Sequence, residues 1–231
     1  GSGPALYIGG LFRFQGDVPT FGTHNVLKWN GTTLTSIAQH DPTGTVGAMA
    51  VYDDGSGAAL YALGLNLGQG EGMYRYDGSA WSGLLGGFPG GVGAHDALSF
   101  DDGNGPKLYV VGDFSGVNLD GVSAPMANTQ RIASWDGAQW APVTPVTGPG
   151  GVGAIEVFQN EILVGGSFAF TNGSGESIRS LARFDGADWR PLGTFEPSAQ
   201  APVTVPSQTY VYGLAAPARM DRDGDGVPDG N

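Results

Sequence analysis

One six-residue phrase occurs four times in this chain and constrains its fold more than any other feature. The clearest copy is Trp135–Trp140, which reads WDGAQW, and the others begin at Trp29, Tyr76 and Phe184. In each copy an aromatic residue ends one apolar run, Asp-Gly or Asn-Gly follows, and a large apolar residue opens the next run. This pattern predicts a tight hairpin of the type I′ kind, in which both central residues need a positive φ. Four copies in 231 residues indicate a repeat protein.

A second phrase gives the length of the repeat independently. It joins Leu-Tyr or Ile-Leu to a short apolar run and glycine, and its copies start at Leu6, Leu60, Leu108 and Ile162. These starts are 54, 48 and 54 residues apart. A third phrase, Val-Gly-Ala, has copies that start at Val46, Val92 and Val152. Each repeat of about 50 residues therefore has room for four short strands, which is typical of one blade of a β-propeller.

The apolar pattern favours an all-β fold, because apolar positions alternate or form short runs and no helical period occurs. We expect a β-propeller of about four four-stranded antiparallel blades in residues 1–216, followed by an acidic tail at 217–231. The first strand of each blade is rich in Gly and Ala and should lie nearest the axis. Aromatic residues of the second and third strands should pack between blades. The predicted blades are at about 5–37, 45–84, 92–143 and 151–192, with a closing strand at 209–215.

The first repeat lacks a first strand of its own. Gly1–Pro4 corresponds to Gly103–Pro106 of the third repeat, so residue 1 falls inside a predicted hairpin. Two explanations stay open. The closing strand at 209–215 pairs with the strand at Leu6 and completes a four-blade ring, or the chain is one piece of a longer propeller. In the second case the open blade edges could also form a homo-oligomer.

Three connections between second and third strands are long, polar and rich in Gly. They cover roughly 13–24, 115–130 and 169–177. Because long surface loops often carry binding function, we expect any ligand of the propeller to contact them.

The acidic tail carries the most specific chemical motif of the chain. Oxygen ligands at alternate positions of a loop suit Ca²⁺, and here carboxylates would act at loop positions 1, 3, 5 and 9 and a backbone carbonyl at position 7. The motif resembles the calcium repeats of thrombospondin type 3 and of dockerin-like tails in secreted bacterial proteins, although it ends before an acidic residue at position 12. The predicted calcium ligands are Asp221, Asp223, Asp225, Val227 and Asp229.

His95 and Asp96 are the second candidate site. They interrupt a predicted inner strand, and two extra residues relative to the preceding repeat suggest a β-bulge there. Near the axis a His-Asp pair could act in acid–base chemistry or bind a metal or ligand. The competing interpretation is a hydrogen-bonded pair at an irregularity of the blade.

Composition narrows the partners. The formal net charge is −12, which disfavours nucleic acid and anionic membranes, and no apolar run is long enough to span a bilayer. The absence of cysteine excludes disulfides and thiolate metal sites. No signal peptide is visible, so we expect either a cytoplasmic chain or a leader removed before residue 1.

Leu108–Phe114, Arg131–Trp140 and Val152–Phe158 together resemble kelch-related propeller repeats. Their amino-acid sequence is similar to that of repeats in large secreted bacterial proteins, often planctomycete-like, and in fungal cortical-marker proteins. The resemblance covers about residues 5–215 and implies a secreted adhesion or scaffold protein. Kelch enzymes of the galactose-oxidase type bind copper through Tyr, His and Cys, and without cysteine no catalytic residue carries over.

The sequence thus predicts a non-enzymatic, extracellular or cell-surface propeller with a protein or glycan partner. One alternative is a carbohydrate-binding, lectin-like propeller that uses the long connections. Another is a glycan-active hydrolase or lyase with its site at the axis. Such an enzyme needs two carboxylates within about 10 Å of each other, and Asp96 and Glu156 are the candidates.

Overall fold

The computed structural model describes residues 5–11, 25–37, 44–65, 72–84, 86–88, 93–118, 124–144, 146–147, 150–192 and 213–214. All regular structure in these residues is β-strand, which confirms the predicted all-β class. None of the described segments forms a helix that could cross a membrane.

The strands form four antiparallel sheets, and each sheet follows chain order. The first sheet contains β1 (Leu6–Gly9), β2 (Val26–Trp29) and β3 (Leu34–Ser36). The second contains β4 (Thr45–Asp53), β5 (Ala58–Leu65), β6 (Met73–Tyr76) and β7 (Trp81–Leu84). The third contains β8 (Ala94–Asp101), β9 (Pro106–Gly112), β10 (Ile132–Trp135) and β11 (Trp140–Pro142). The fourth contains β12 (Val152–Phe158), β13 (Glu161–Thr171), β14 (Ser177–Phe184) and β15 (Trp189–Pro191).

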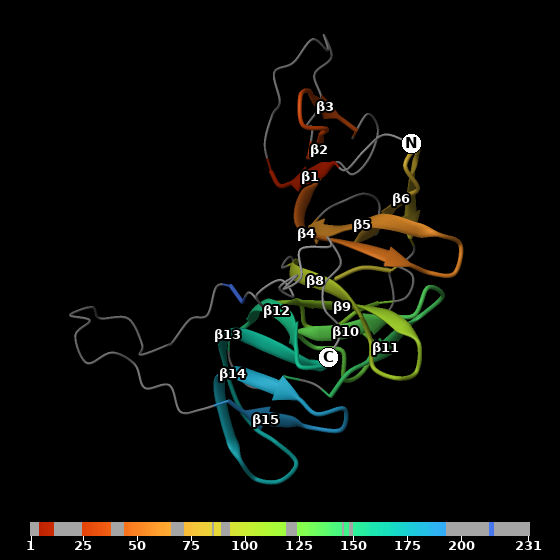
Figure 1. Ribbon diagram of the computed structural model, residues 1–231. Helices are drawn as coiled ribbons and strands as arrows, with labels where there is room; N and C mark the ends of the chain where they lie inside the picture. The colour runs from red at the N-terminus through yellow and green to blue at the C-terminus, as the bar shows by residue number, and fades with distance from the viewer. Residues whose placement is uncertain are drawn as a thin grey trace, which may run out of the picture.

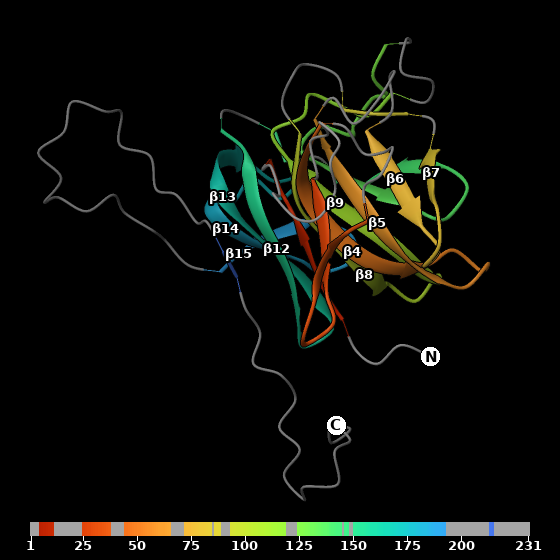
Figure 2. The same ribbon diagram turned by 90° about the horizontal axis from the view of Figure 1, so that it is seen from above.

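The four sheets follow one another along an arc. The inner strands β4, β8 and β12 lie next to one another, and the other strands of each sheet fan outward (Figures 1 and 2). The first and fourth sheets stand at opposite ends of the arc (Figure 1). Among the described residues the first sheet has three strands, and β1 pairs only with β2, as expected for a repeat without its own first strand. The predicted closing strand at 209–215 lies outside the described residues, except for Gly213 and Leu214.

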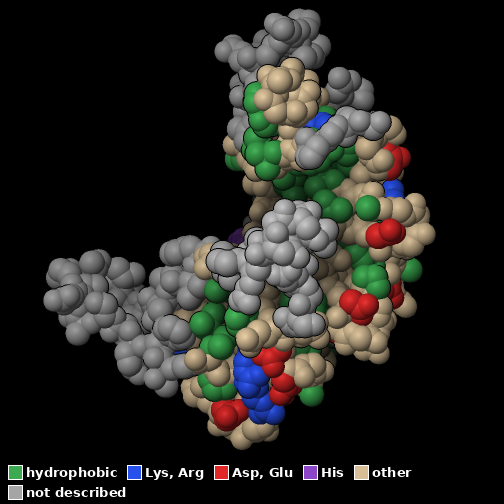
Figure 3. All heavy atoms as spheres, in the orientation of Figure 1, with side chains coloured by type: hydrophobic (Ala, Val, Ile, Leu, Met, Phe, Trp, Pro, Cys, Tyr) green, Lys and Arg blue, Asp and Glu red, His purple; other side chains and the backbone are tan. Residues whose placement is uncertain are grey.

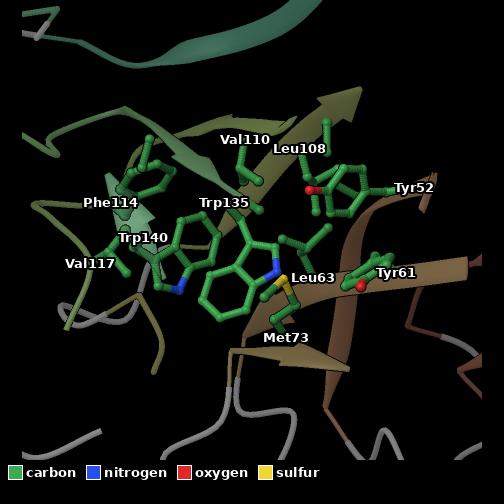
Figure 4. Close-up of a cluster of buried hydrophobic side chains, with 14 of the residues drawn as sticks. Tyr52, Tyr61, Leu63, Met73, Leu108, Val110, Phe114, Val117, Trp135 and Trp140 are labelled. Carbon is green, nitrogen blue, oxygen red and sulfur yellow. The ribbon is translucent and has the colours of Figure 1, made fainter. Parts of the chain in front are cut away.

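The hydrophobic core lies between successive sheets. Trp135 and Trp140 of the third sheet pack against Tyr61, Leu63 and Met73 of the second (Figure 4). The two indole rings lie 5.5 Å apart, centre to centre. A similar cluster joins the third and fourth sheets. These clusters confirm that the repeated aromatic residues pack between sheets.

Each sheet presents two faces with distinct and repeated residue types. The leading face carries apolar residues that lie opposite one another in the strand register, and in the second, third and fourth sheets it points toward the preceding sheet. In the four sheets these residues are Leu6, Ile8, Trp29 and Leu34; Leu60, Ala62, Tyr76 and Trp81; Leu108, Val110, Trp135 and Trp140; and Ile162, Val164, Phe184 and Trp189. The trailing face is the opposite one, and in the first, second and third sheets it points toward the following sheet. It carries Tyr7, Val26 and Lys28; Tyr52, Tyr61, Met73 and Arg75; Phe100, Tyr109 and Ile132; and Phe158, Leu163, Leu181 and Arg183.

Indole nitrogens add directional contacts between sheets. Trp81 Nε1 donates to the carbonyl oxygen of Ile37 at 2.9 Å, which ties the second sheet to the first. Trp189 Nε1 donates to the carbonyl oxygen of Thr144 at 2.7 Å, which ties the fourth sheet to the third. In the second and fourth sheets the leading tryptophan therefore both packs and hydrogen-bonds, whereas the equivalent Trp140 of the third sheet packs without a partner for its Nε1 among the described residues.

The Asp-Gly phrase forms the predicted hairpin, but the predicted turn type is wrong. Trp135 pairs with Trp140, so the loop has four residues, and only Gly137 among them has a positive φ. Asp136 instead accepts the backbone N–H groups of Ala138 and Gln139 with one carboxylate oxygen. Asp therefore occurs in this turn because its carboxylate accepts hydrogen bonds from the backbone N–H groups of the turn.

The third long connection was also predicted wrongly. Residues 169–171 continue β13, residue 177 begins β14, and Ala169 pairs with Arg179. Asn172 closes this hairpin, because its side-chain oxygen accepts the N–H groups of Ser174 and Glu176 at 3.1 and 2.8 Å. Its buried amide also donates to the backbone oxygen of Trp189 at 2.8 Å, which ties the hairpin to β15. The second connection, at 115–130, packs on the second sheet through paired backbone hydrogen bonds between Asn118 and Gly87. The first connection lies outside the described residues.

Candidate functional site

His95 occupies a β-bulge that recurs in three sheets. The strand register shifts by one residue at Gly47, at His95 and at Gly153. The predicted bulge is therefore present, but extra residues are not its cause. Ala94, His95 and Asp96 are the structural equivalents of Val46, Gly47 and Ala48, so the two additional residues precede β8.

At Gly47 and His95 the bulge brings an inner strand against the inner strand of the next sheet. A side chain at Gly47 would overlap the carbonyl oxygen of Ala94 in the following sheet. His95 has the same relation to its own following sheet, and its Nδ1 lies 3.2 Å from the carbonyl oxygen of Val152. Because a carbonyl can only accept, this contact is a hydrogen bond in the form of the imidazole that carries a proton on Nδ1. At Gly47 the two backbones touch directly and leave no room for a side chain, whereas at the equivalent position of the third sheet the imidazole of His95 makes the contact with the next sheet.

The other ring nitrogen of His95 points toward a carboxylate. Nε2 lies 3.7 Å from Asp113 Oδ2, and both side chains are about two-fifths exposed. Asp113 follows β9, and its carboxylate lies directly over Gly151, where any side chain would overlap it. The pair therefore sits at the junction of the third and fourth sheets and remains open to solvent.

Asp96 joins the two inner strands of this junction. Its Oδ1 accepts the N–H of Ala97 at 2.9 Å, and its Oδ2 accepts the N–H of Ile155 in β12 at 3.0 Å. Burial raises the pKa of Asp96 above its ordinary value, and the Glu156 carboxylate adds to the increase. The two backbone hydrogen bonds oppose it. Both oxygens of Asp96 thus already have partners within the fold.

Arg131 lies behind this junction. Its guanidinium donates to the carbonyl oxygens of Gly150 and of Val146, the latter at 2.9 Å. Burial lowers the pKa of Arg131, and the charge of Asp113 opposes this shift. Sequence reasoning missed Asp113 and Arg131. Asp113 could have been noticed in the sequence, because it places a charged residue where the first and fourth repeats have the uncharged Leu11 and Ser167.

The paired aspartates at 53–54 and 101–102 lie at the hairpin turns that follow β4 and β8. Asp101 accepts the N–H groups of Gly103 and Gly105. Asp102 accepts Lys107 at 2.8 Å and the Tyr109 hydroxyl at 2.9 Å. Burial alone would raise the pKa of Asp102, but these hydrogen bonds outweigh it and lower the pKa to about 2.

The described residues contain no group of three or more His, Asp or Glu side chains arranged to hold a metal ion. The predicted calcium ligands, from Asp221 to Asp229, lie outside the described residues. The structure brings His95 and Asp96 together with Asp113 and Glu156, and it uses both oxygens of Asp96 for backbone contacts. No protein-family model and no curated protein matches this chain.

Proposed function

We propose that the four sheets are successive blades of a β-propeller. Three features support this proposal: each sheet is a meander in chain order, the inner strands lie side by side, and leading faces pack on trailing faces in the same way at each junction. In this proposal β4, β8 and β12 line the axis.

We further propose that the chain is a non-enzymatic interaction or structural module of a cell-surface or extracellular assembly. One observation carries this proposal: the leading face of the first sheet exposes Leu6, Ile8 and Trp29 to solvent. Exposed apolar patches of this kind mark sites of contact with other macromolecules. The polar groups at the inner strands, in contrast, mostly bind backbone groups of the neighbouring sheet.

A glycan-active enzyme is the second candidate, because Asp96 and Glu156 are close enough to influence each other's charge. Glu156 Oε1 accepts the N–H of Val157 at 2.9 Å, so this carboxylate also has a backbone partner. An acid–base pair would need one carboxylate free to act on substrate. The structural use of Asp96 and Glu156 therefore favours the non-enzymatic proposal.

A polysaccharide panel assayed for new reducing ends, together with a glycan array, tests the proposal. We expect neither release nor binding from the purified chain. Reducing ends that disappear in folded Asp96→Asn or Glu156→Gln variants would establish the enzyme instead. Glycan binding that is lost in His95→Ala would establish a lectin.

We also propose that the tail binds Ca²⁺ through Asp221, Asp223, Asp225, Asp229 and the backbone of Val227. Carboxylate and carbonyl oxygens are the donors that calcium prefers, and extracellular sites fill at about 10⁻⁴–10⁻³ M calcium. A calcium role would agree with secretion of the whole module.

A further inference from the structure

We infer that the leading face of the first sheet binds the trailing face of the fourth sheet in a second copy of this chain. The inference rests on the proposed function, in which an exposed end face is a contact surface. It adds the identity of the partner and the surface that the partner presents.

The leading face of the first sheet is exposed where its equivalents are buried. Leu6 is 60% exposed, and Ile8 and Trp29 are 38% and 37% exposed. The equivalent residues Leu108 and Val110 are fully buried. Leu27, opposite Ile8 on the same face, is already buried, so the open part of the face consists of Leu6, Ile8 and Trp29.

The molecule itself shows what covers a leading face. In the second, third and fourth sheets the cover is the trailing face of the preceding sheet. Leu108 and Trp135 lie in one cluster with Tyr61 and Met73, and Ile162 lies in one cluster with Tyr109 and Ile132. The leading face of the first sheet should therefore fit a trailing face that carries aromatic or large aliphatic side chains.

One trailing face of the described chain lies at an end of the arc, on the fourth sheet. Phe158 is 45% exposed there, whereas its equivalent Tyr52 is 2% exposed. The face keeps part of the pattern of the covered trailing faces: Leu163 and Leu181 replace Tyr61 and Met73, and Arg183 stands where Arg75 stands. It differs at two positions, because Glu156 and Gly165 stand where the second sheet has Ala50 and Leu63. Arg183 also pairs with Glu161 at 2.6 Å, which makes this face more polar and favours reversible association.

The two complementary faces of one chain stand at opposite ends of the arc (Figure 1). Figure 3 shows hydrophobic side chains on the first sheet and on the hollowed side of the arc, and acidic and basic side chains gathered at the far end. A leading face and a trailing face are different surfaces, so their contact is heterologous and joins copies head to tail.

Sedimentation of the purified chain over a wide concentration range provides the first test. We expect the average mass to rise reversibly above that of the 23.6 kDa monomer. Ile8→Lys on the leading face and Phe158→Lys on the trailing face should each weaken association at least tenfold. Gln139→Lys, in an exposed turn of the third sheet, makes the same change in charge and should associate like the parent chain.

Mixing the two variants gives the decisive measurement. The Ile8→Lys chain keeps its trailing face and the Phe158→Lys chain keeps its leading face, so together they should form a 1:1 heterodimer and nothing larger. Circular dichroism and the urea midpoint check that both variants are folded.

Three outcomes would overturn the inference: a parent chain that stays monomeric, a mixture of variants that stays monomeric, or loss of association in Ile8→Lys but not in Phe158→Lys. The last outcome would identify a leading-to-leading contact. None of them bears on the glycan and polysaccharide assays, so the proposed function stands or falls separately.

Discussion

Trp189 provides the sharpest test of how the sheets are held together. Its side chain is fully buried between the third and fourth sheets, and its ring centre lies 5.1 Å from that of Phe184. Its Nε1 donates to the carbonyl oxygen of Thr144 at 2.7 Å. Replacing Trp189 by Ala removes this packing and leaves the Thr144 oxygen without its donor.

The expected loss follows from these two contributions. Truncation of a buried Trp to Ala lowers the free energy of unfolding by about 3–5 kcal/mol. Trp189→Phe keeps an aromatic ring and loses the hydrogen bond, which contributes about 0.5–1.5 kcal/mol, and some ring volume. We therefore expect Trp189→Phe to cost about 1–2 kcal/mol. Trp29 is the matched control, because it carries the same side chain on a leading face but is 37% exposed.

Urea unfolding followed by far-UV circular dichroism measures these free energies without relying on tryptophan fluorescence. Unchanged m-values would show that each variant unfolds as the same cooperative unit. The reasoning is refuted if Trp189→Ala costs no more than Trp29→Ala. Such a result would mean that the leading-face position does not hold adjacent sheets together.

The remaining predictions concern charge and metal. Four turn aspartates have a pKa lowered to about 2 in the fold, and these are Asp54, Asp77, Asp102 and Asp185. Their ionised forms stabilise the fold at pH values above their unfolded pKa of about 4. The free energy of unfolding should therefore fall steadily as the pH is lowered from about 4 to about 2. Asp96→Ala should lower stability by about 1–3 kcal/mol at pH 4, because the buried N–H of Ile155 loses its acceptor. The raised pKa of Asp96 makes its ionisation unfavourable in the fold, so the difference between parent and variant should narrow as the pH rises, and a pH-independent difference would contradict this assignment. Isothermal titration should detect calcium binding to the full chain but not to a chain without residues 217–231, and equal binding by both would remove the tail as the site.

The repeat pattern predicted the sheets well, because apolar alternation and turn residues are local signals. Turn geometry was harder. The sequence pointed to Asp-Gly for two-residue turns with positive φ, yet the two-residue turn of the fourth sheet is Gln159–Asn160, with φ values of 51° and 64°. The pairing of Phe158 with Glu161 leaves only these two residues for the turn, and Gln-Asn is not the pair of residue types from which such a turn is predicted. Similarly, nothing local shows that Phe170 pairs with Ile178 instead of lying in a loop.

At the candidate site, too, some features could be predicted from the sequence and others could not. His95 and Asp96 stood out in the sequence because they interrupt a predicted inner strand that has two extra residues. Their partners could not be predicted, because Asp113 and Ile155 reach the junction through different strands. The role of Asp96 as an acceptor for the following sheet depends on the distance between β8 and β12, which no sequence spacing encodes.

The repeated match between leading and trailing faces bears on how this protein could change over evolutionary time. Because each junction joins the same two surfaces, a duplicated repeat inserted between two sheets meets a complementary neighbour on each side. Duplication and deletion of whole repeats therefore preserve the core, whereas a partial repeat would disrupt it. Variation in chain length among descendants should come in steps of about 50 residues, with the turns and outer strands free to diverge.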